Sequence, residues 1–257
     1  MRIRPDVELA NLTDLGIQRE QNEDYFLYLE PEDDEEFARK GRLLLVADGM
    51  GGHQGGEVAS GIAAEALREA FLNTNEEDPR TILVRGFSQA QRQILERGNE
   101  TDTLVGMGTT CTAVILRNGE LSFGHIGDSR LYLLRSGVLT QLTEDHTLVH
   151  QLVKGGALSK DEAASYDQKN VLTAALGMRS DEVTADFSQA PLALSAGDTL
   201  IVSSDGLHGV IDDSQIAEVA GTRGPDEACR ELLSLAFERG APDNITVQIL
   251  RVVRVTP

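Results

Sequence analysis

The chain has 257 residues, of which 40% are hydrophobic, and its formal net charge is −19. That length can bury a substantial core in one large domain or two small ones. The acidic excess disfavours nucleic acids and acidic membrane surfaces as partners, because both are bound through Lys and Arg side chains. No apolar run approaches the ~20 residues that cross a bilayer, and the N-terminal residues lack the apolar stretch of a signal peptide. We therefore expect a cytoplasmic protein that binds neither membranes nor nucleic acids.

The first half of the chain begins with strands and continues with helices. Hydrophobic periodicity and turn residues predict a strand, a solvated acidic loop, a second strand and two helices, in that order, at 25–30, 31–36, 42–47, 57–72 and 79–97. The second strand ends at Asp48, and a glycine-dense turn follows it.

Three short segments with β character come next, at 109–117, 120–126 and 130–135. Asn118-Gly119 and Gly127-Asp128 separate them, and both pairs are favourable hairpin turns. Hairpins join antiparallel strands, so the sheets are expected to be antiparallel.

The second half is more polar at first and then resumes a regular pattern. Two helical pieces, a strand, two helices and a closing strand are predicted at 146–154, 159–165, 198–204, 212–220, 225–238 and 244–254. No linker or repeat divides the chain, so we expect one domain over residues 1–257. Its pattern predicts an α/β sandwich with helices on the outer faces of the sheets. The pattern leaves the number of layers open.

The two cysteines, Cys111 and Cys229, lie in apolar segments and share no short spacing. We expect buried free thiols rather than a disulfide or a metal pair. Neither cysteine stands in a CxxxxxR pattern, which disfavours a cysteinyl-phosphate intermediate.

Three aspartates share one setting, each at the end of a predicted strand and each followed by Gly or Asn. They are Asp48, Asp205 and Asp243. Carboxylates that converge repel one another unless they are protonated or bridged by cations, and sites built only from oxygen suit Mg²⁺ or Mn²⁺ better than Zn²⁺. The alternative is that Asp-Gly and Asp-Asn are simply common turn formers.

Two further segments supply candidates for phosphate chemistry. The glycine-rich run at 48–57 matches no nucleotide-binding loop, and its His53 is a candidate general acid. His146 is the next candidate for that role. Near the N-terminus, Glu23 and Asp24 could add carboxylates, and Arg19 could bind a phosphate dianion through a forked pair of hydrogen bonds. An isolated Arg is more commonly a surface residue.

With these residues in place, the sequence resembles the PPM family, the type 2C metal-dependent serine/threonine protein phosphatases, in its compact bacterial form. The motifs run in order across nearly the whole chain: RxxNED at 19–24, VADGMGGHxGGExAS at 46–60, GTT at 108–110, GDSR at 127–130, LTxDH at 142–146, NxLTxALG at 170–177, SDG at 204–206 and DNIT at 243–246. DGMGGH and GDSR are distinctive, whereas DNIT alone is weak.

The resemblance implies a four-layer αββα sandwich, with two antiparallel sheets packed face to face and a flap at about 147–190 beside the active site. It implies two core ions, Mg²⁺ or Mn²⁺, and a third ion that is bound more weakly. The implied ligands of the core ions are Glu23, Asp24, Asp48, Gly49, Asp205 and Asp243, with Asp48 as the bridge and Gly49 acting through its carbonyl. Asp128 would help to bind the third ion, Arg19 would hold the phosphate, and His53 is the catalytic acid candidate.

The implied activity is hydrolysis of phosphoserine and phosphothreonine by water that the cations activate. The partners would be phosphorylated proteins, the substrates of serine/threonine kinases, and the protein would act as a monomer. Two alternatives remain open: a catalytically weak metal-binding regulator with the same fold, and a phosphohydrolase of small molecules. One position departs from the family pattern, because Ala174 stands where the family often has Arg, so a charged contact at the flap is missing.

Overall fold

The computed structural model describes residues 3–51, 55–73, 78–164, 166–178 and 183–255. The strands are β1 (Val7–Asp14), β2 (Asp24–Leu29), β3 (Arg42–Met50), β4 (Gly108–Thr109), β5 (Cys111–Arg117), β6 (Glu120–Ile126), β7 (Arg130–Arg135), β8 (Val138–Gln141), β9 (Asp186–Phe187), β10 (Leu192–Ala193), β11 (Thr199–Ser203) and β12 (Ile245–Val252). The helices are α1 (Asp34–Lys40), α2 (Gly55–Leu72), α3 (Pro79–Glu100), α4 (Leu148–Lys154), α5 (Lys160–Ala164), α6 (Asp205–His208), α7 (Asp213–Thr222) and α8 (Pro225–Glu238), with a 3₁₀ turn at Asp102–Leu104.

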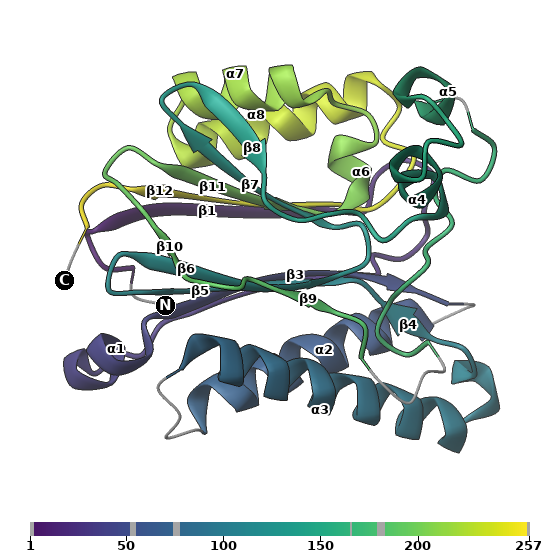
Figure 1. The fold of residues 1–257 in the computed structure, drawn as a ribbon, viewed down its shortest axis with the longest axis horizontal. Coiled ribbons are helices and arrows are strands. Elements are labelled where there is room, and N and C mark those ends of the chain that lie inside the picture. The colour runs from purple at the N-terminus through teal and green to yellow at the C-terminus, as the bar shows by residue number, and fades with distance from the viewer. Residues whose placement is uncertain (1–2, 52–54, 74–77, 165, 179–182, 256–257) are drawn as a thin grey trace.

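Two antiparallel sheets pack face to face, and helices cover their outer faces (Figure 1). One sheet has the strand order β1-β12-β11-β7-β8 and carries α7 and α8. The other has the order β10-β6-β5-β3-β2, with β4 beside β3 and β9 beside β6, and it carries α2 and α3. The predicted sandwich is therefore confirmed, with the four layers that the family resemblance implied.

The structure explains the continuous apolar run inside strand β3. Side chains alternate between the two faces of a strand, and here both faces are covered. Leu43 and Leu45 pack toward the cluster that includes α2 and α3, whereas Leu44 and Val46 pack into the cluster between the two sheets. All four are fully buried. A strand covered on both faces requires a continuous hydrophobic run rather than an alternating one.

Two expectations from composition can be compared with the structure. Cys111 and Cys229 are both buried and free, as predicted. Among the residues described, no helix combines the length and the apolar character needed to cross a membrane.

The acidic run near residue 33 is a helix start, so the prediction of a solvated loop at 31–36 was wrong for its second half. The side chain of Asp33 accepts a hydrogen bond from the Glu36 N–H at 2.8 Å and caps α1. Acidic residues fill the first turn and Arg39 and Lys40 fill the last, which matches the helix dipole at both ends. The acidic residues therefore indicated the capped start of a helix as well as a polar segment.

Of the two predicted hairpins, one is present and one is not. Asn118 and Gly119 have φ values of 52° and 74° and join β5 to β6 as neighbours in one sheet, as predicted. Gly127-Asp128 instead carries the chain out of one sheet and into the other, because β6 belongs to the lower sheet of Figure 1 and β7 pairs with β11 and β8 in the upper one. A hairpin there was therefore a wrong prediction.

The strands next to Asp48, Asp205 and Asp243 lead to one end of the sandwich. The observed limits of β3 and the place of Asp243 differ slightly from the predictions. Strand β3 does not stop at Asp48 but continues to Met50, because Gly49 and Met50 pair with β4. Asp243 precedes β12 instead of following a strand. It still lies at the same edge as Asp205, because the end of β11 pairs antiparallel with the beginning of β12, Ser203 opposite Val247. Antiparallel pairing thus brings both aspartates to one end of the sheet.

Candidate active site

A pocket of about 340 Å³ opens at this end of the sandwich. Its lining residues are Arg19, Glu23, Asp48, Gly49, Met50, Gly51, Thr110, Asp128, Asn170, Leu172, Met178, Asp205 and Asp243. The predicted site residues therefore converge, with two exceptions. Asp24 is buried opposite Asp48 in the register of β2 and β3 and does not line the pocket, and His53 lies outside the residues that the structure describes.

The backbone at Asp48 is held on both sides by threonines of the GTT segment. The Asp48 N–H donates to Thr110 Oγ1 at 2.9 Å, and the Asp48 carbonyl accepts from the Thr110 N–H and from Thr109 Oγ1, both at 2.9 Å. Both threonines are buried. The sequence motif contained these residues, but their spacing alone gave no sign of this supporting role.

Glycines in the segment after Asp48 allow a helix start to approach β3. A Cβ atom on Gly49 would overlap the carbonyl of Gly56 and lie 2.7 Å from the Glu23 carbonyl oxygen. A Cβ on Gly56 would lie 2.6 Å from Glu23 Oε1. The Gly49 N–H also donates to the Glu23 carbonyl at 3.1 Å. The glycines therefore serve close packing of β3, α2 and the residues before β2.

The carboxyl groups around the pocket raise one another's pKa values. Burial and the charges of its acidic neighbours raise the pKa of Asp48 well above its usual range. Burial, followed by the charge of Asp205, raises the pKa of Asp128 to about 8. Burial raises the pKa of Asp24 to about 7 although Ser204 donates a hydrogen bond to it. Burial and the charge of Asp243 raise the pKa of Asp205, which a hydrogen bond with Asp48 partly offsets. Such a cluster is unfavourable without a positive charge among its members.

The donor set fits divalent cations. Asp24 Oδ1 and Asp205 Oδ1 are buried and have no hydrogen-bond partner in the part of the chain that the structure describes. Arg19 is the one cationic residue among the described lining residues. Within the described ranges, no three His, Cys, Asp or Glu side chains already form a ready-made set of ligands, so the carboxylates share a pocket but would move closer around an ion. Oxygen-only ligands select Mg²⁺ or Mn²⁺.

The metal-free protein is expected to lose stability as the pH rises from 6.5 to 8.5. The folded-state pKa values of Asp24 and Asp128, about 7 and 8, lie above the unfolded values. The folded state therefore binds more protons in this window, and the free energy of unfolding falls with pH, by about 1–3 kcal/mol. Burial lowers the pKa values of His125 and His208, which act in the opposite direction mainly below pH 6.5. Urea unfolding of chelator-treated protein checks this, and Asp128→Asn should reduce the slope. Equal slopes in the two proteins would contradict it.

Arg19 reaches across the pocket rim to a candidate ligand. Its Nη2 lies 2.7 Å from Asp243 Oδ2, and the two side chains are 49% and 30% exposed. The hydrogen bond that Arg19 donates to Asp243 raises the pKa of Arg19. The guanidinium is therefore charged, close to the carboxylates and accessible, which are the properties that binding of a phosphate dianion requires.

Arg19→Ala is expected to raise KM for a phosphothreonine peptide about 10- to 100-fold, with a smaller effect on kcat. A charge-assisted hydrogen bond contributes similarly in the substrate complex and in the transition state when it holds a non-reacting oxygen. Steady-state kinetics check this, with Arg19→Lys as the control that keeps the charge but loses the fork. A loss confined to kcat would show that Arg19 acts mainly on the transition state.

Asn244 and Ser204 are supporting residues to which the sequence assigned no role. Asn244 Oδ1 accepts from the Glu23 N–H at 2.9 Å, while its Nδ2 donates to the carbonyls of Leu15 and Gln21, both at 2.9 Å. Ser204 Oγ donates to Asp24 Oδ2 at 2.7 Å. Both side chains are buried, so the segment with Arg19, Glu23 and Asp24 is fixed to the opposite sheet.

Comparisons with known proteins agree with this geometry. The sequence profile of the family Protein phosphatase 2C matches residues 22–239. The serine/threonine phosphatase stp of Listeria monocytogenes is 36% identical over 243 residues, which cover 93% of this chain and 93% of that protein. The serine/threonine phosphatase of S. agalactiae superposes with a TM-score of 0.86 at 36% identity, covering 96% of this chain and 99% of that one. The catalytic domain of PstP, solved with two manganese ions, superposes with a TM-score of 0.81 at 34% identity, covering 96% and 98%.

The chain belongs to the protein phosphatase 2C family. It is a metal-dependent serine/threonine protein phosphatase that uses Mg²⁺ or Mn²⁺.

Proposed function

We propose that this phosphatase hydrolyses phosphoserine and phosphothreonine in proteins by direct attack of water. The observation that carries the proposal is the ring of buried and half-buried, mutually repelling carboxyl groups around a pocket with one arginine at its rim. A phosphate monoester dianion would be repelled by this ring without bound cations. With them, the same ring supplies a place for phosphate oxygens and for a water molecule.

The proposed ligands follow from the placement of the side chains. Asp48 would bridge two core ions, with the Gly49 carbonyl, Asp205 and Asp243 beside it. Glu23 lines the pocket, and Asp24 stands opposite Asp48 in the register of β2 and β3. When bound, the cations would lower the pKa of water and balance charge on the phosphoryl group.

The remaining roles belong to side chains around the substrate position. Arg19 would bind the phosphoryl oxygens. Asp128 would serve a third, weaker ion. His53 would donate a proton to the leaving serine or threonine oxygen, a role that stays a prediction. The flap at about 147–190 would border the substrate, because Asn170 and Leu172 line the pocket. Ala174 offers no charge there and packs against the core cluster under α2 and α3.

We propose a cytoplasmic monomer whose substrates are proteins phosphorylated by serine/threonine kinases. The formal net charge of −19 supports a protein that does not bind nucleic acids or acidic membranes. No specific feature of the pocket favours either a small-molecule substrate or a weakly active regulator. The complete set of Arg19, Asp48, Asp205 and Asp243 at one pocket argues against the regulator.

A substrate panel tests the proposal. Phosphothreonine and phosphoserine peptides, sugar phosphates and nucleotides would be compared at equal Mn²⁺ concentration by phosphate release. We expect kcat/KM for the peptides to exceed that for the small molecules by about 10²-fold or more, because contacts outside the phosphate contribute binding energy. Higher kcat/KM for sugar phosphates or nucleotides would overturn the protein substrate, and no turnover of any compound would support the regulator.

A further inference from the structure

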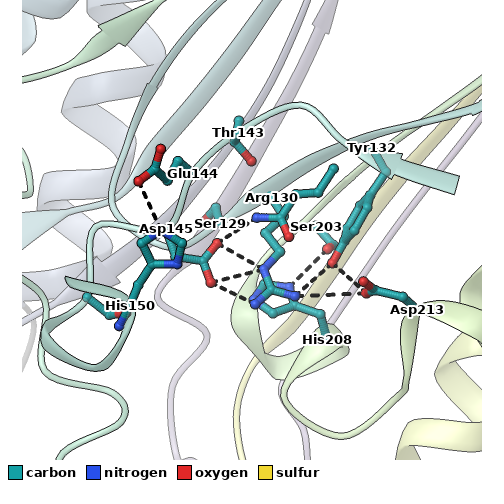
Figure 2. Close-up of polar contacts among 12 residues, drawn as sticks. Ser129, Arg130, Tyr132, Thr143, Glu144, Asp145, His150, Ser203, His208 and Asp213 are labelled. Carbon is teal, nitrogen blue, oxygen red and sulfur yellow. Dashed lines mark hydrogen bonds and ion pairs between the residues drawn. The ribbon is translucent and has the colours of Figure 1, made fainter. Parts of the chain in front are cut away.

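The turn that carries Asp128 is held from both sides by two consecutive residues of the loop after β8. On one side, the His146 N–H donates to the Gly127 carbonyl at 2.8 Å, and the Gly127 N–H donates to His146 Nδ1 at 3.1 Å. On the other side, Arg130 Nε and Nη2 donate to the Asp145 carboxylate at 3.0 and 2.6 Å (Figure 2). Asp128 lies between the two attachment points.

The ion pair between Arg130 and Asp145 is itself held by further hydrogen bonds. Arg130 Nη1 donates to the Tyr132 hydroxyl at 3.0 Å, and that hydroxyl donates to Asp213 Oδ1 at 3.2 Å (Figure 2). Arg130 and Asp145 are 22% and 13% exposed in their side chains. Because this ion pair is partly buried and bidentate, it fixes the loop relative to β7 more firmly than a surface pair would.

The turn needs such restraints because it crosses from one sheet to the other. A hairpin turn is fixed by the ladder of its two strands, but β6 and β7 are not neighbours. Gly127 has a φ of 103°, and a Cβ there would lie 2.6 Å from Thr110 Cβ. The Asp128 carboxyl group, moreover, is repelled by Asp205 and Asp145. The repulsion therefore opposes the observed position of this carboxyl group, and the restraints on the turn act against it.

Both ring nitrogens of His146 are already occupied. Nδ1 accepts from Gly127, so the ring proton lies on Nε2, which faces Asp186 Oδ2 at 3.2 Å. The ring packs 5.0 Å from that of His125, and His146 is not among the residues that line the active-site pocket. This placement does not suit a group that donates a proton to the leaving oxygen.

We propose that His146, together with Asp145, is a positioning residue that fixes the Asp128 carboxylate at the edge of the pocket. The inference rests on the proposed role of Asp128 as a ligand of the third, weaker ion. It also removes His146 from the candidates for the general acid.

Two variants of similar size distinguish the contributions of the two ring nitrogens of His146. His146→Asn places an amide oxygen near the position of Nδ1 and can still accept from the Gly127 N–H. His146→Gln reaches toward the position of Nε2 and Asp186 but leaves Gly127 without its acceptor. The first readout is hydrogen exchange of the Gly127 amide in the metal-free protein, which needs no cation and no turnover.

We expect exchange at Gly127 to be about 10-fold faster in His146→Gln and within about 3-fold of wild type in His146→Asn. In a calorimetric titration, the weakest Mn²⁺ site should lose about 10-fold in affinity in His146→Gln and little in His146→Asn. His146→Gln should add no further loss in an Asp128→Asn background. Unchanged exchange in His146→Gln, or equal Mn²⁺ loss in both variants, would overturn the positioning role.

A different result is expected if Asp128 is not a ligand of the third ion. If Asp128→Asn left all Mn²⁺ binding unchanged while Gly127 exchange followed the expected pattern, the ligand assignment would be overturned and the restraint on the turn would stand. A general acid predicts a third pattern: both variants would slow a phosphothreonine peptide more than p-nitrophenyl phosphate, because only the alkoxide needs a proton. That pattern, with unchanged Gly127 exchange, would overturn the inference.

Discussion

Asp48→Asn is expected to lower turnover of a phosphothreonine peptide by more than about 10³-fold at saturating Mn²⁺. Asp48 lies at the centre of the carboxyl cluster, and the charges of Asp24, Asp205, Asp128 and Asp243 all act on it. A bridging ligand that loses its charge weakens both core ions, and each contributes several kcal/mol of transition-state stabilisation. Steady-state kinetics and calorimetric Mn²⁺ titration measure the two effects.

Asp128→Asn is the matched control for this change. It removes one carboxylate charge from the same pocket but acts on the proposed third ion only. We expect it to retain two tight Mn²⁺ sites and to lower turnover less than Asp48→Asn does. In the metal-free state, the urea concentration at the midpoint of unfolding should be the same as in the wild type or higher for both variants, because each removes a repelled charge from the pocket. Two tight ions still bound by Asp48→Asn would show that the bridging assignment is wrong.

Gly49→Ala is expected to lower turnover by about 10²-fold and the free energy of unfolding by about 1–3 kcal/mol. The added methyl group would overlap the Gly56 carbonyl at the start of α2 and crowd the Glu23 carbonyl. Both neighbours are backbone atoms, so the methyl group can be accommodated only by moving β3 away from α2 or from Glu23. Either movement displaces Asp48, the adjacent residue.

Gly61→Ala, a substitution inside α2, is the control for Gly49→Ala. Apart from its chain neighbours and the backbone of its own helix, no atom of the described residues lies within 4 Å of a Cβ at Gly61, and alanine is favoured over glycine inside a helix by about 1 kcal/mol. Gly61→Ala should therefore leave turnover unchanged and raise the free energy of unfolding slightly. If Gly49→Ala behaved like Gly61→Ala in kinetics and urea unfolding, the close approach of β3 and α2 would not matter for the site.

The long helices and the buried strands were predictable because their signals are local. Periodicity and the apolar run placed α2, α3, α8 and β3 within a few residues of their observed ends. Strand β1 was not predicted, although it pairs with β12 along eight residues. Its sequence, VELANLTD, mixes polar and apolar residues, and its strand character comes from a partner more than 230 positions away. The short strands β9 and β10 likewise depend on pairing with β6.

The members of the site were predictable, but their supports were not. Asp48, Asp205 and Asp243 each precede Gly or Asn near a strand end. Antiparallel pairing of β11 with β12 brings Asp205 and Asp243 together, and Asp48 joins them at the pocket from the facing sheet. The roles of Asn244 and Ser204 depend on hydrogen bonds between segments about 180 to 230 residues apart. Nothing in local sequence reports such contacts. The same holds at Gly127, where a favourable hairpin dipeptide joins two different sheets.

Phosphate release from a phosphothreonine peptide by chelator-stripped protein, measured before and after Mn²⁺ is added back, tests the central claim most directly. The claim is that the carboxylates of one pocket act only through bound divalent cations, because beside the carboxylate set the described residues that line the pocket include no cysteine and no histidine that could attack phosphate. We expect no turnover in excess chelator and full recovery with Mn²⁺. Undiminished turnover in excess chelator, after the metal has been stripped, would contradict the account.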